Sequence, residues 1–383
     1  MNSLLILFHV ESNTGYAIGR LEPIFFEMAM QLCGRDYSKI HIAYTSMSKG
    51  RPTTLPADFN QYLVIDPADA SADASANVQK YLQTHGIDTL FGFDQPVSRP
   101  LYKYFRAGGV RHFISYWGAP ISSVFPPLKR MLKRLEVSLK RNGPDYYIFE
   151  SQGMADTAVL GRGIPSRKVG VVYLGVDSEK FRPDGRHRNV VFDTFGIAAT
   201  RRIFFYSGHM EARKGVQVIM DAARHLAEHR SHDDWHILLV GNKNGEEQPY
   251  VESLRGHPGA AHVTFGGYRA NIEELHRGCF AGIIASTGWD SLTCSSMEIQ
   301  ASGLPLLLSN LPGLNEAIQP DKSGLLFAAG DAQALAGAME TLLDDPALHQ
   351  KLSAGARDRI TQRFTQAHQV TQLVAALQSV VRQ

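Results

Sequence analysis

Two loops in the second half of the chain carry side chains that could hold a phosphorylated ligand. The first loop, residues 207–215, follows an apolar run typical of a strand and precedes a run with helical periodicity. A helix N-terminus presents free backbone N–H groups that attract phosphate, and Arg213 and Lys214 add cationic donors at the same end. A solvated helix start with incidental basic residues would give the same pattern, so this loop alone leaves both interpretations open.

The second loop, residues 286–298, also joins an expected strand to an expected helix. Asp290 lies in this loop, and Glu298 follows two helical turns later. Residues 291–293 would expose their N–H groups at the helix start. Taken alone, the loop fits a capping aspartate followed by a surface glutamate, which is the more ordinary interpretation.

Together the two loops resemble the motif pair of the retaining GT-B glycosyltransferases of family 4, the glycosyl transferases group 1. That family has Gly-Arg-x4-Lys-Gly after the first strand of its second domain, then an acidic residue, seven residues and Glu, followed by Ala-x-Gly-x-Pro. This chain has Gly208-His209-x4-Lys214-Gly215, then Asp290-x7-Glu298 followed by Ala-Ser-Gly-Leu-Pro. Further family signposts match residues 173–177, 239–242, 264–268 and 323–327.

The resemblance implies a nucleotide-diphosphate sugar donor, UDP- or GDP-linked, and assigns roles to the matching residues. Lys214 and His209 would neutralise the diphosphate and Asp290 would touch the donor sugar, so these three are the predicted catalytic residues. Glu298 would bond the ribose hydroxyls. The other predicted donor-binding residues are Gly15, Gly208, Arg213, Gly267, Tyr268, Ser291, Leu292 and Thr293.

Two positions depart from the family pattern. His209 stands where the family has arginine, and a neutral imidazole offers one donor where a guanidinium offers five. We therefore expect Lys214 with Arg213 to bind the phosphates and His209 to be secondary. Asp290 is one methylene shorter than the more common glutamate, and Ser-Leu-Thr follows it in place of Gly-Phe-Gly, so the sugar is left open.

The first half of the chain matches the family only loosely. Gly15, in a loop after the first expected strand, would let backbone approach phosphate or acceptor, and a simple turn explains it equally well. Trp117 stands where relatives have a histidine and could stack on a sugar, although a core position is the more common role of an aromatic residue. His112 is a weaker acceptor candidate.

The length and patterning predict two α/β domains. A chain of 383 residues exceeds one ordinary core, and short apolar runs alternate with amphipathic stretches, which indicates doubly wound parallel sheets in a GT-B arrangement of two Rossmann-like domains facing a cleft. We expect an acceptor domain over residues 1–183, a donor domain over 184–365 and a last helix, 366–383, crossing back to the first domain. The apolar run at residues 4–10 is too short for a membrane span, so we expect a cytoplasmic protein.

Composition excludes several other classes. The net charge of +2 and the scattered aromatic residues do not favour nucleic acid as a partner. Three widely spaced cysteines suggest neither a disulfide framework nor a zinc site. No Asp-x-Asp tripeptide occurs, so we expect neither a metal at the diphosphate nor any other cofactor.

Residues 126–141 form a basic amphipathic stretch. Its apolar residues share one helical face, and six lysines and arginines occupy the remainder. Such a helix can lie on an anionic membrane surface, peripherally at the inner face. A helix that packs its apolar stripe into the core is the interpretation modestly favoured by the sequence.

The resulting hypothesis is a retaining glycosyltransferase that moves a hexose to a glycan or lipid-linked acceptor in polysaccharide or glycolipid assembly. A non-catalytic nucleotide-sugar-binding protein and another GT-B enzyme, such as a nucleotide-sugar epimerase, are the alternatives. The missing Gly-x-Gly-x-x-Gly disfavours a nicotinamide oxidoreductase.

Overall fold

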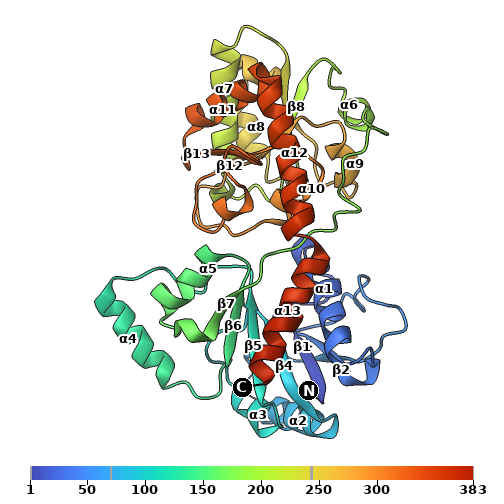
Figure 1. The fold of residues 1–383 in the computed structure, drawn as a ribbon, viewed down its shortest axis with the longest axis vertical. Coiled ribbons are helices and arrows are strands. Elements are labelled where there is room, and N and C mark those ends of the chain that lie inside the picture. Colours follow the sequence, from blue (N-terminus) through green and yellow to red (C-terminus); the bar gives the residue numbers. More distant parts are fainter. Residues whose placement is uncertain (1, 70, 242–244, 383) are drawn as a thin grey trace. The chain divides into compact units, whose positions relative to one another are not determined.

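The computed structural model describes residues 2–69, 71–241 and 245–382, and the chain divides into two compact units (Figure 1). Unit 1 comprises Met1–Tyr173 and Ala367–Gln383, and unit 2 comprises Leu174–Gln366. Each unit is a parallel sheet with helices on both faces, which confirms the predicted α/β class with two doubly wound domains. The first division precedes the segment 184–189 in which the sequence placed the link between domains.

Unit 1 contains a seven-stranded sheet in the order β3-β2-β1-β4-β5-β6-β7. Its strands are β1 (Ser3–Leu7), β2 (Ile40–Tyr44), β3 (Tyr62–Val64), β4 (Ile87–Phe93), β5 (His112–Trp117), β6 (Tyr146–Phe149) and β7 (Val169–Val171). Its helices are α1 (Tyr16–Leu32), α2 (Ala72–Thr84), α3 (Tyr102–Ala107), α4 (Pro127–Ser138), α5 (Gln152–Asp156) and α13 (Gln366–Val381). Every residue of β1, β2 and β4 is buried, because helices cover both faces of a parallel sheet.

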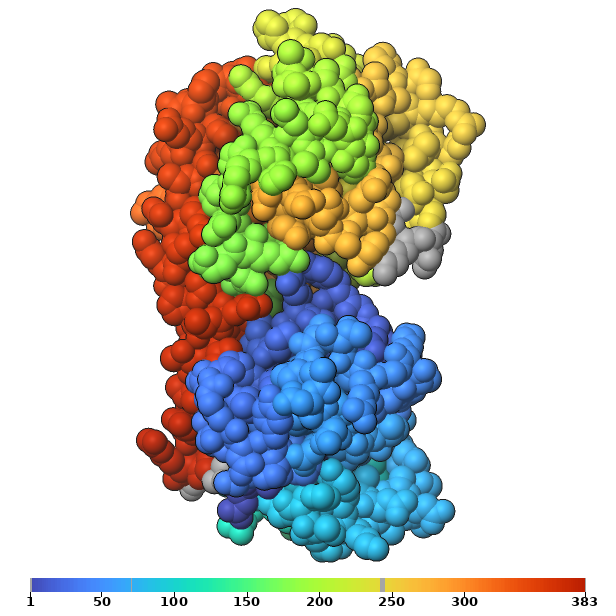
Figure 2. Space-filling model, turned by 90° about the vertical axis from the view of Figure 1, so that its right-hand side faces the viewer, coloured from blue at the N-terminus to red at the C-terminus, as the bar shows by residue number. Residues whose placement is uncertain are grey.

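Unit 2 contains a six-stranded sheet in the order β10-β9-β8-β11-β12-β13. Its strands are β8 (Arg202–Ser207), β9 (Trp235–Val240), β10 (Val263–Phe265), β11 (Ala281–Ile284), β12 (Leu306–Ser309) and β13 (Gly324–Phe327). Its helices are α6 (Val190–Phe195), α7 (Val216–His229), α8 (Gln248–Leu254), α9 (Ile272–His276), α10 (Cys294–Ala301), α11 (Ala332–Asp344) and α12 (Pro346–Arg363). Helices α7 and α11 share an apolar cluster of this unit, and Figure 2 shows α11 and α12, in red, along one side of its surface.

The strand order reverses once in each sheet. In unit 1 the reversal lies between β1 and β4, and in unit 2 it lies between β8 and β11. At such a switch point the loops leave neighbouring strands in opposite directions and open a crevice, and ligands of doubly wound sheets bind there. The two switch points are therefore the places at which each unit can hold a ligand.

Helix α4 corrects one expectation from the sequence. The stripe of residues 128, 131, 132, 135 and 139 does share one helical face, but all five side chains are exposed and no residue of α4 is buried. The interpretation of α4 as a helix with its stripe in the core is therefore wrong. Helix α4 packs mainly on the neighbouring π-helix, η2 (Thr157–Arg162) (Figure 1). No helix in the described part of the chain combines the length and the hydropathy needed to cross a membrane.

Candidate functional site

The two predicted loops of unit 2 meet at its switch point. Strands β8 and β11 pair in parallel, so the loop after β8 and the loop after β11 leave the same edge of the sheet side by side. Lys214 Nζ lies 2.7 Å from Asp290 Oδ2, and Ser286 donates from Oγ to the same oxygen at 2.7 Å. Both partners of the ion pair are largely buried. The structure thus brings two of the three predicted catalytic residues into contact across 76 residues of sequence.

Glycine is required where the first loop turns into helix α7. Gly215 has φ 71°, and a Cβ there would lie 1.8 Å from the carbonyl oxygen of Ala285 at the end of β11. Gly241 has φ 112°, and a Cβ there would lie 2.7 Å from the nitrogen of Gly208. These close approaches hold the loops after β8, β9 and β11 together at one edge of the sheet.

Residues that the sequence did not single out fix the course of the first loop. Tyr206 donates its hydroxyl to the carbonyl of His209 at 2.5 Å. The N–H of Met210 donates to Glu246 Oε2 at 2.8 Å, and Tyr250 donates to the carbonyl of Met210 at 2.7 Å. Tyr206 lies in β8, and Glu246 and Tyr250 follow β9, so all three come from segments at the same edge of the sheet. Their positions relative to these strands could have identified them in the sequence.

The second loop reaches its helix later than expected. Thr293 is the N-cap of α10, whose first residue is Cys294, and its side chain forms a capping box with Ser296. The N–H of Thr293 donates to Ser296 Oγ at 3.2 Å, so the expected exposed N–H groups at residues 291–293 do not form the first helical turn. Ser291 and Leu292 precede the helix and are buried. The capping box decides the start because its two reciprocal hydrogen bonds fix the first turn.

A serine pair connects the two loops. Ser295, in the first turn of α10, donates from Oγ to the carbonyl oxygen of Ser207 at 2.7 Å, and the two hydroxyl oxygens lie 2.8 Å apart. Glu298 lies further along α10 and is buried, which overturns the surface-glutamate interpretation. Asp290 is not a helix cap either, because Thr293 holds that position. Asp290 and Glu298 are therefore both buried carboxylates of the candidate site.

The predicted base-binding loop follows β10. The N–H of Gly241 donates to the carbonyl of Gly267 at 2.9 Å, which ties this loop to the end of β9. Tyr268 is exposed beside it. Asn242, the last residue of the signpost at 239–242, lies outside the described residues.

Arg213 and His209 differ in how firmly they are held. The guanidinium group of Arg213 donates to Glu211 Oε2 at 2.9 Å and to the carbonyl of Trp289 at 3.3 Å, and it lies 4.3 Å from the centre of the Trp289 ring. The side chain of His209 is 71% exposed, and its Nδ1 lies 3.7 Å from Glu246. Arg213 is thus fixed between the two loops, whereas the imidazole extends into solvent.

The switch point of unit 1 carries a histidine and a carboxyl group that the sequence analysis missed. His9 follows β1 and Asp94 follows β4, and His9 Nε2 lies 4.0 Å from Asp94 Oδ2. The N–H of Gly118 donates to Asp94 Oδ1 at 3.4 Å, and Asp94 has φ 51°, a left-handed conformation that aspartate tolerates better than most residues. Burial raises the pKa of Asp94 to about 7, against a smaller lowering by the Gly118 N–H.

A second buried carboxyl group stands at the end of β6. Tyr116 donates its hydroxyl to Glu150 Oε1 at 3.1 Å, and Gln369 of α13 donates to the same hydroxyl at 2.9 Å. Burial, together with the nearby charge of Asp94, raises the pKa of Glu150 to about 8, against a lowering by the Tyr116 hydrogen bond. Both carboxyl residues directly follow apolar strands, a sequence signal that could have identified them.

The three predicted residues of unit 1 do not form one group. His112 begins β5 and Trp117 ends it, so they lie at opposite edges of the sheet, and only Trp117 reaches the carboxyl edge. Trp117 stacks on Phe149 with ring centres 6.4 Å apart and packs against a core cluster, and its Nε1 is buried without a hydrogen-bond partner in the described part of the chain. Gly15, with φ 74°, is exposed and precedes the first residue of α1.

Within residues 2–69, 71–241 and 245–382, no group of three or more histidine, cysteine, aspartate or glutamate side chains is placed to hold a metal ion. The expectation of metal-free chemistry remains a prediction.

Solved structures define the class of the fold. A glycosyltransferase from Rickettsia africae superposes with a TM-score of 0.82 at 16% identity, covering 100% of this chain and 99% of that one. The Anabaena protein HepE in complex with UDP superposes with a TM-score of 0.76 at 18% identity, covering 98% and 100% of the two chains. The fold is that of the GT-B glycosyltransferases.

Sequence comparison relates unit 2 to a known family. Residues 188–359, almost all of unit 2, match the family described as glycosyl transferases group 1. A glycogen synthase of Mycobacterium tuberculosis is 30% identical over 243 residues, which cover 62% of this chain and 54% of the synthase. The second unit is thus similar to the glycosyl transferases group 1, and the chain spans about half the length of the first curated relatives it matches.

Proposed function

We propose that this chain is a retaining glycosyltransferase of family 4 that moves a hexose from a nucleotide-diphosphate sugar to a glycan or lipid-linked acceptor. The observation that carries the proposal is the Lys214–Asp290 pair at the switch point of unit 2, where the ammonium group lies 2.7 Å from the carboxylate. A cation held at the start of α7 stands where a diphosphate would meet helix N–H groups. The similarity of unit 2 to the family supports the same use of this site.

The chemistry of glycosyl transfer requires stabilisation of the leaving group. As the bond to the sugar breaks, negative charge develops on the diphosphate and positive charge on the sugar carbon. A preorganised cation and N–H dipoles aimed at the leaving diphosphate are then the largest catalytic contribution, and no metal is needed in this scheme. We assign Lys214 and Arg213 to the diphosphate, Asp290 to the sugar and Glu298 to the ribose hydroxyls.

The remaining donor contacts follow the loops around this pair. We assign Gly208, His209 and residues 291–293 to the sugar-phosphate part of the proposed site, and Gly267 with Tyr268 to the base. The base is uracil or guanine, and UDP is the first candidate because HepE, a neighbour in fold, was crystallised with UDP. In unit 1, we assign Gly15 to donor binding and Trp117 to acceptor binding. A cytoplasmic location follows from a cytoplasmic nucleotide-sugar donor and is proposed with it.

A thermal-shift screen with UDP, GDP and their sugars tests the donor assignment. A ligand that binds only the folded protein at 100 times its dissociation constant adds about 2.7 kcal/mol of stability, which is readily measured as a rise in Tm. The Lys214→Ala variant should lose the rise, and Arg224→Ala, which removes a surface cation of the same unit paired with Asp221 at 3.0 Å, should keep it. No shift of the parent protein with any nucleotide would refute the proposal.

A non-catalytic nucleotide-sugar-binding protein is the second candidate, because an exposed histidine replaces the family's arginine at position 209. Incubation with a donor that binds separates the two functions. Release of free UDP or GDP, or appearance of a glycosylated acceptor, shows transferase activity. A donor recovered unchanged after saturating binding supports the second candidate, and a donor recovered as its epimer would reveal an epimerase.

A further inference from the structure

Helix α4 exposes an unusually apolar face. Leu128, Met131, Leu132, Leu135 and Leu139 follow one another at helical spacing, and between 59% and 72% of each is exposed. Soluble monomers rarely leave a continuous row of large apolar side chains in water, and such a row marks an interaction surface. We call these five residues the α4 stripe.

The α4 stripe points outward because the opposite face of α4 packs on the protein. Glu136 pairs with Lys133 and with Arg162 of η2, both at 2.8 Å. Val137 packs against the apolar cluster beneath the helix. Gly163 has φ 83°, and a Cβ there would lie 2.6 Å from the nitrogen of Arg134, so backbone meets backbone at this contact. The helix is thus anchored through η2, and the α4 stripe is left facing solvent.

Positive charge surrounds the stripe. Residues 126–141 contain six lysines and arginines and one glutamate, so this short segment carries +5 in a chain whose total net charge is +2. The six cations are Lys129, Arg130, Lys133, Arg134, Lys140 and Arg141. The remainder of the chain is therefore slightly acidic, and the positive charge is concentrated where the apolar side chains are exposed.

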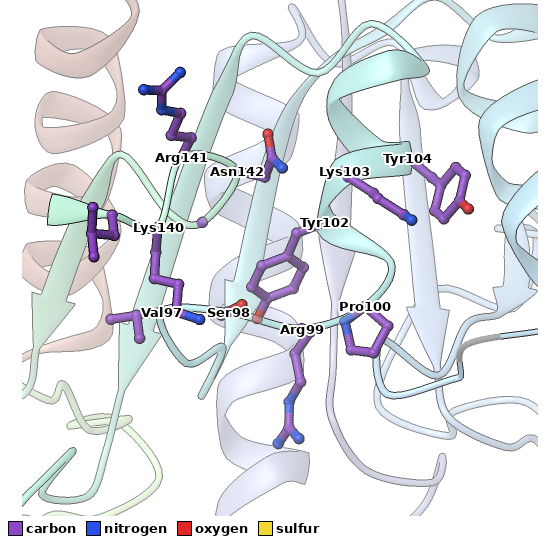
Figure 3. Close-up of a pocket in the computed structure, with 12 residues that line it drawn as sticks. Val97, Ser98, Arg99, Pro100, Tyr102, Lys103, Tyr104, Lys140, Arg141 and Asn142 are labelled. Atoms are coloured by element: carbon purple, nitrogen blue, oxygen red, sulfur yellow. The ribbon is translucent and has the colours of Figure 1, made fainter. Parts of the chain in front are cut away.

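A basic cavity continues the stripe at the end of α4. The cavity has a volume of about 680 Å³ and is lined by the loop before α3, the start of α3 and the segment from Leu139 to Gly143. Leu139, the last residue of the α4 stripe, forms part of its wall. Figure 3 shows these lining residues: Tyr102 lies between Lys140 and Arg99, and Arg99, Lys103 and Arg141 extend in different directions. None of the four cations forms an ion pair with a carboxylate among the described residues.

We propose that the α4 stripe and this cavity together form a docking face for an anionic phospholipid bilayer. The stripe enters the boundary between headgroups and acyl chains, the flanking cations meet the negative surface, and the cavity takes a lipid headgroup phosphate between Arg99 and Lys140. Apolar side chains flanked by basic residues are the composition that partitions into anionic interfaces. Charged donors around one cavity are the chemistry that binds phosphate.

The same charges disfavour the other occupants of this face. A second copy of the chain would bring +5 against +5 across an apolar contact, and like charges at an interface oppose association. A soluble phosphate compound would use the cavity but would leave the α4 stripe in water. An anionic bilayer is the partner that satisfies both features at once.

Vesicle flotation tests the proposal without donor, acceptor or turnover, so its failure leaves the glycosyltransferase assignment untouched. The full chain is mixed with vesicles of phosphatidylcholine alone, or with phosphatidylglycerol at three parts in ten, at low and at high salt. We expect at least about tenfold stronger partitioning to the anionic vesicles at low salt, because surface potential attracts the basic segment within a Debye length.

Two variants separate the apolar part from the basic part of the face. Leu128→Ser/Leu132→Ser/Leu135→Ser should lower partitioning about tenfold or more, because the lost apolar burial drives insertion. Its matched control is Val64→Ser/Val251→Ser, which removes exposed apolar side chains elsewhere and should bind as the parent does.

The charge variant is Arg99→Gln/Lys140→Gln/Arg141→Gln, which should also lower partitioning about tenfold and remove its salt dependence. Its control is Lys80→Gln/Lys322→Gln/Lys351→Gln, which removes three exposed cations outside this face and should bind as the parent does. All variants change exposed side chains, and an unchanged Tm verifies that each is folded.

Three results would overturn the proposal. The first is equal binding of the parent and the stripe variant to anionic vesicles. The second is a dimer in sedimentation velocity that the stripe variant abolishes, which would make the face a contact between copies. The third is stabilisation by inorganic phosphate without any vesicle binding, which would make the cavity a site for a soluble phosphate compound.

Discussion

The two switch points share a topology and differ in their chemistry. In unit 2 a fixed ammonium group and a carboxylate lie 2.7 Å apart beside two helix starts. In unit 1 the corresponding loops present His9 and Asp94, with Glu150 nearby, and burial raises the pKa of Asp94 to about 7 and that of Glu150 to about 8. The edge of unit 2 is suited to a multiply charged anion. The edge of unit 1 holds carboxyl groups whose raised pKa values allow them to donate or accept protons. The fold supplies the location, and the residues that follow each strand decide what can bind there.

The largest effect should come from the cation of unit 2. We expect Lys214→Ala to lower kcat/KM for transfer about 10²- to 10³-fold, the range seen when one preorganised charge-stabilising donor is removed. Steady-state kinetics with the donor identified by thermal shift measure it, with Arg224→Ala as the surface control. Activity within a few-fold of the parent would show that the two switch points do not differ in the way proposed.

The matching change in unit 1 should spare donor binding. We expect Asp94→Asn to leave the UDP- or GDP-induced rise in Tm unchanged and to lower transfer about tenfold or more, since general acid–base groups contribute in this range or above. Transfer assays at varied acceptor concentration measure the change. Loss of the nucleotide-induced shift in Asp94→Asn would place Asp94 itself in the donor site and contradict the proposed difference between the two switch points.

The backbone geometry at the switch point of unit 2 should affect the free energy of unfolding. We expect Gly215→Ala to destabilise the protein by roughly 3 kcal/mol or more, because its Cβ would overlap the Ala285 carbonyl oxygen in addition to the left-handed strain. Gly196→Ala is the matched control, since φ is 64° there and a Cβ would meet nothing within 4 Å, so only about 1 kcal/mol is expected. Urea unfolding measures both, and equal losses would contradict the close approach.

The buried carboxyl groups of unit 1 should make stability pH-dependent. Their pKa values are higher in the folded than in the unfolded chain, so the folded state holds protons that the unfolded state has released. The contribution of these two groups to the free energy of unfolding is therefore complete below about pH 4. It is lost as the pH rises through about 7 and 8. Urea unfolding between pH 5 and 9 should show a shallower fall for Glu150→Gln, and an unchanged slope would argue that Glu150 is solvated.

The smallest effect separates the Arg213 and His209 side chains of the first loop. Because Arg213 is held between Glu211 and Trp289 while His209 extends into solvent, we expect Arg213→Ala to weaken nucleotide binding about tenfold and His209→Ala by a factor of two or less. Isothermal titration with UDP or GDP measures both. The opposite order would mean that the histidine takes the role of the family's arginine.

Much of the fold and part of the site were predictable from the sequence. Apolar runs alternating with amphipathic stretches determine two doubly wound sheets, because a parallel strand is buried on both faces and reads as a continuous apolar run. The spacing of Lys214, Asp290 and Glu298 in the two loops indicated a resemblance to the glycosyl transferases group 1, and residues 188–359 match that family. The position of Asp94 and Glu150 directly after apolar strands is a further signal in the sequence, because the carboxyl ends of parallel strands form the ligand-binding edge.

Other features depended on the tertiary structure. The contact between Lys214 and Asp290 requires β8 and β11 to be neighbours, and strand order is set by packing between distant segments, which local sequence does not encode. The burial that raises the pKa of Asp94 and Glu150 comes from elements far along the chain, as the Gln369 contact shows. Periodicity showed that α4 has an apolar face, but only the packing of its opposite face on η2 decided that the stripe points to solvent.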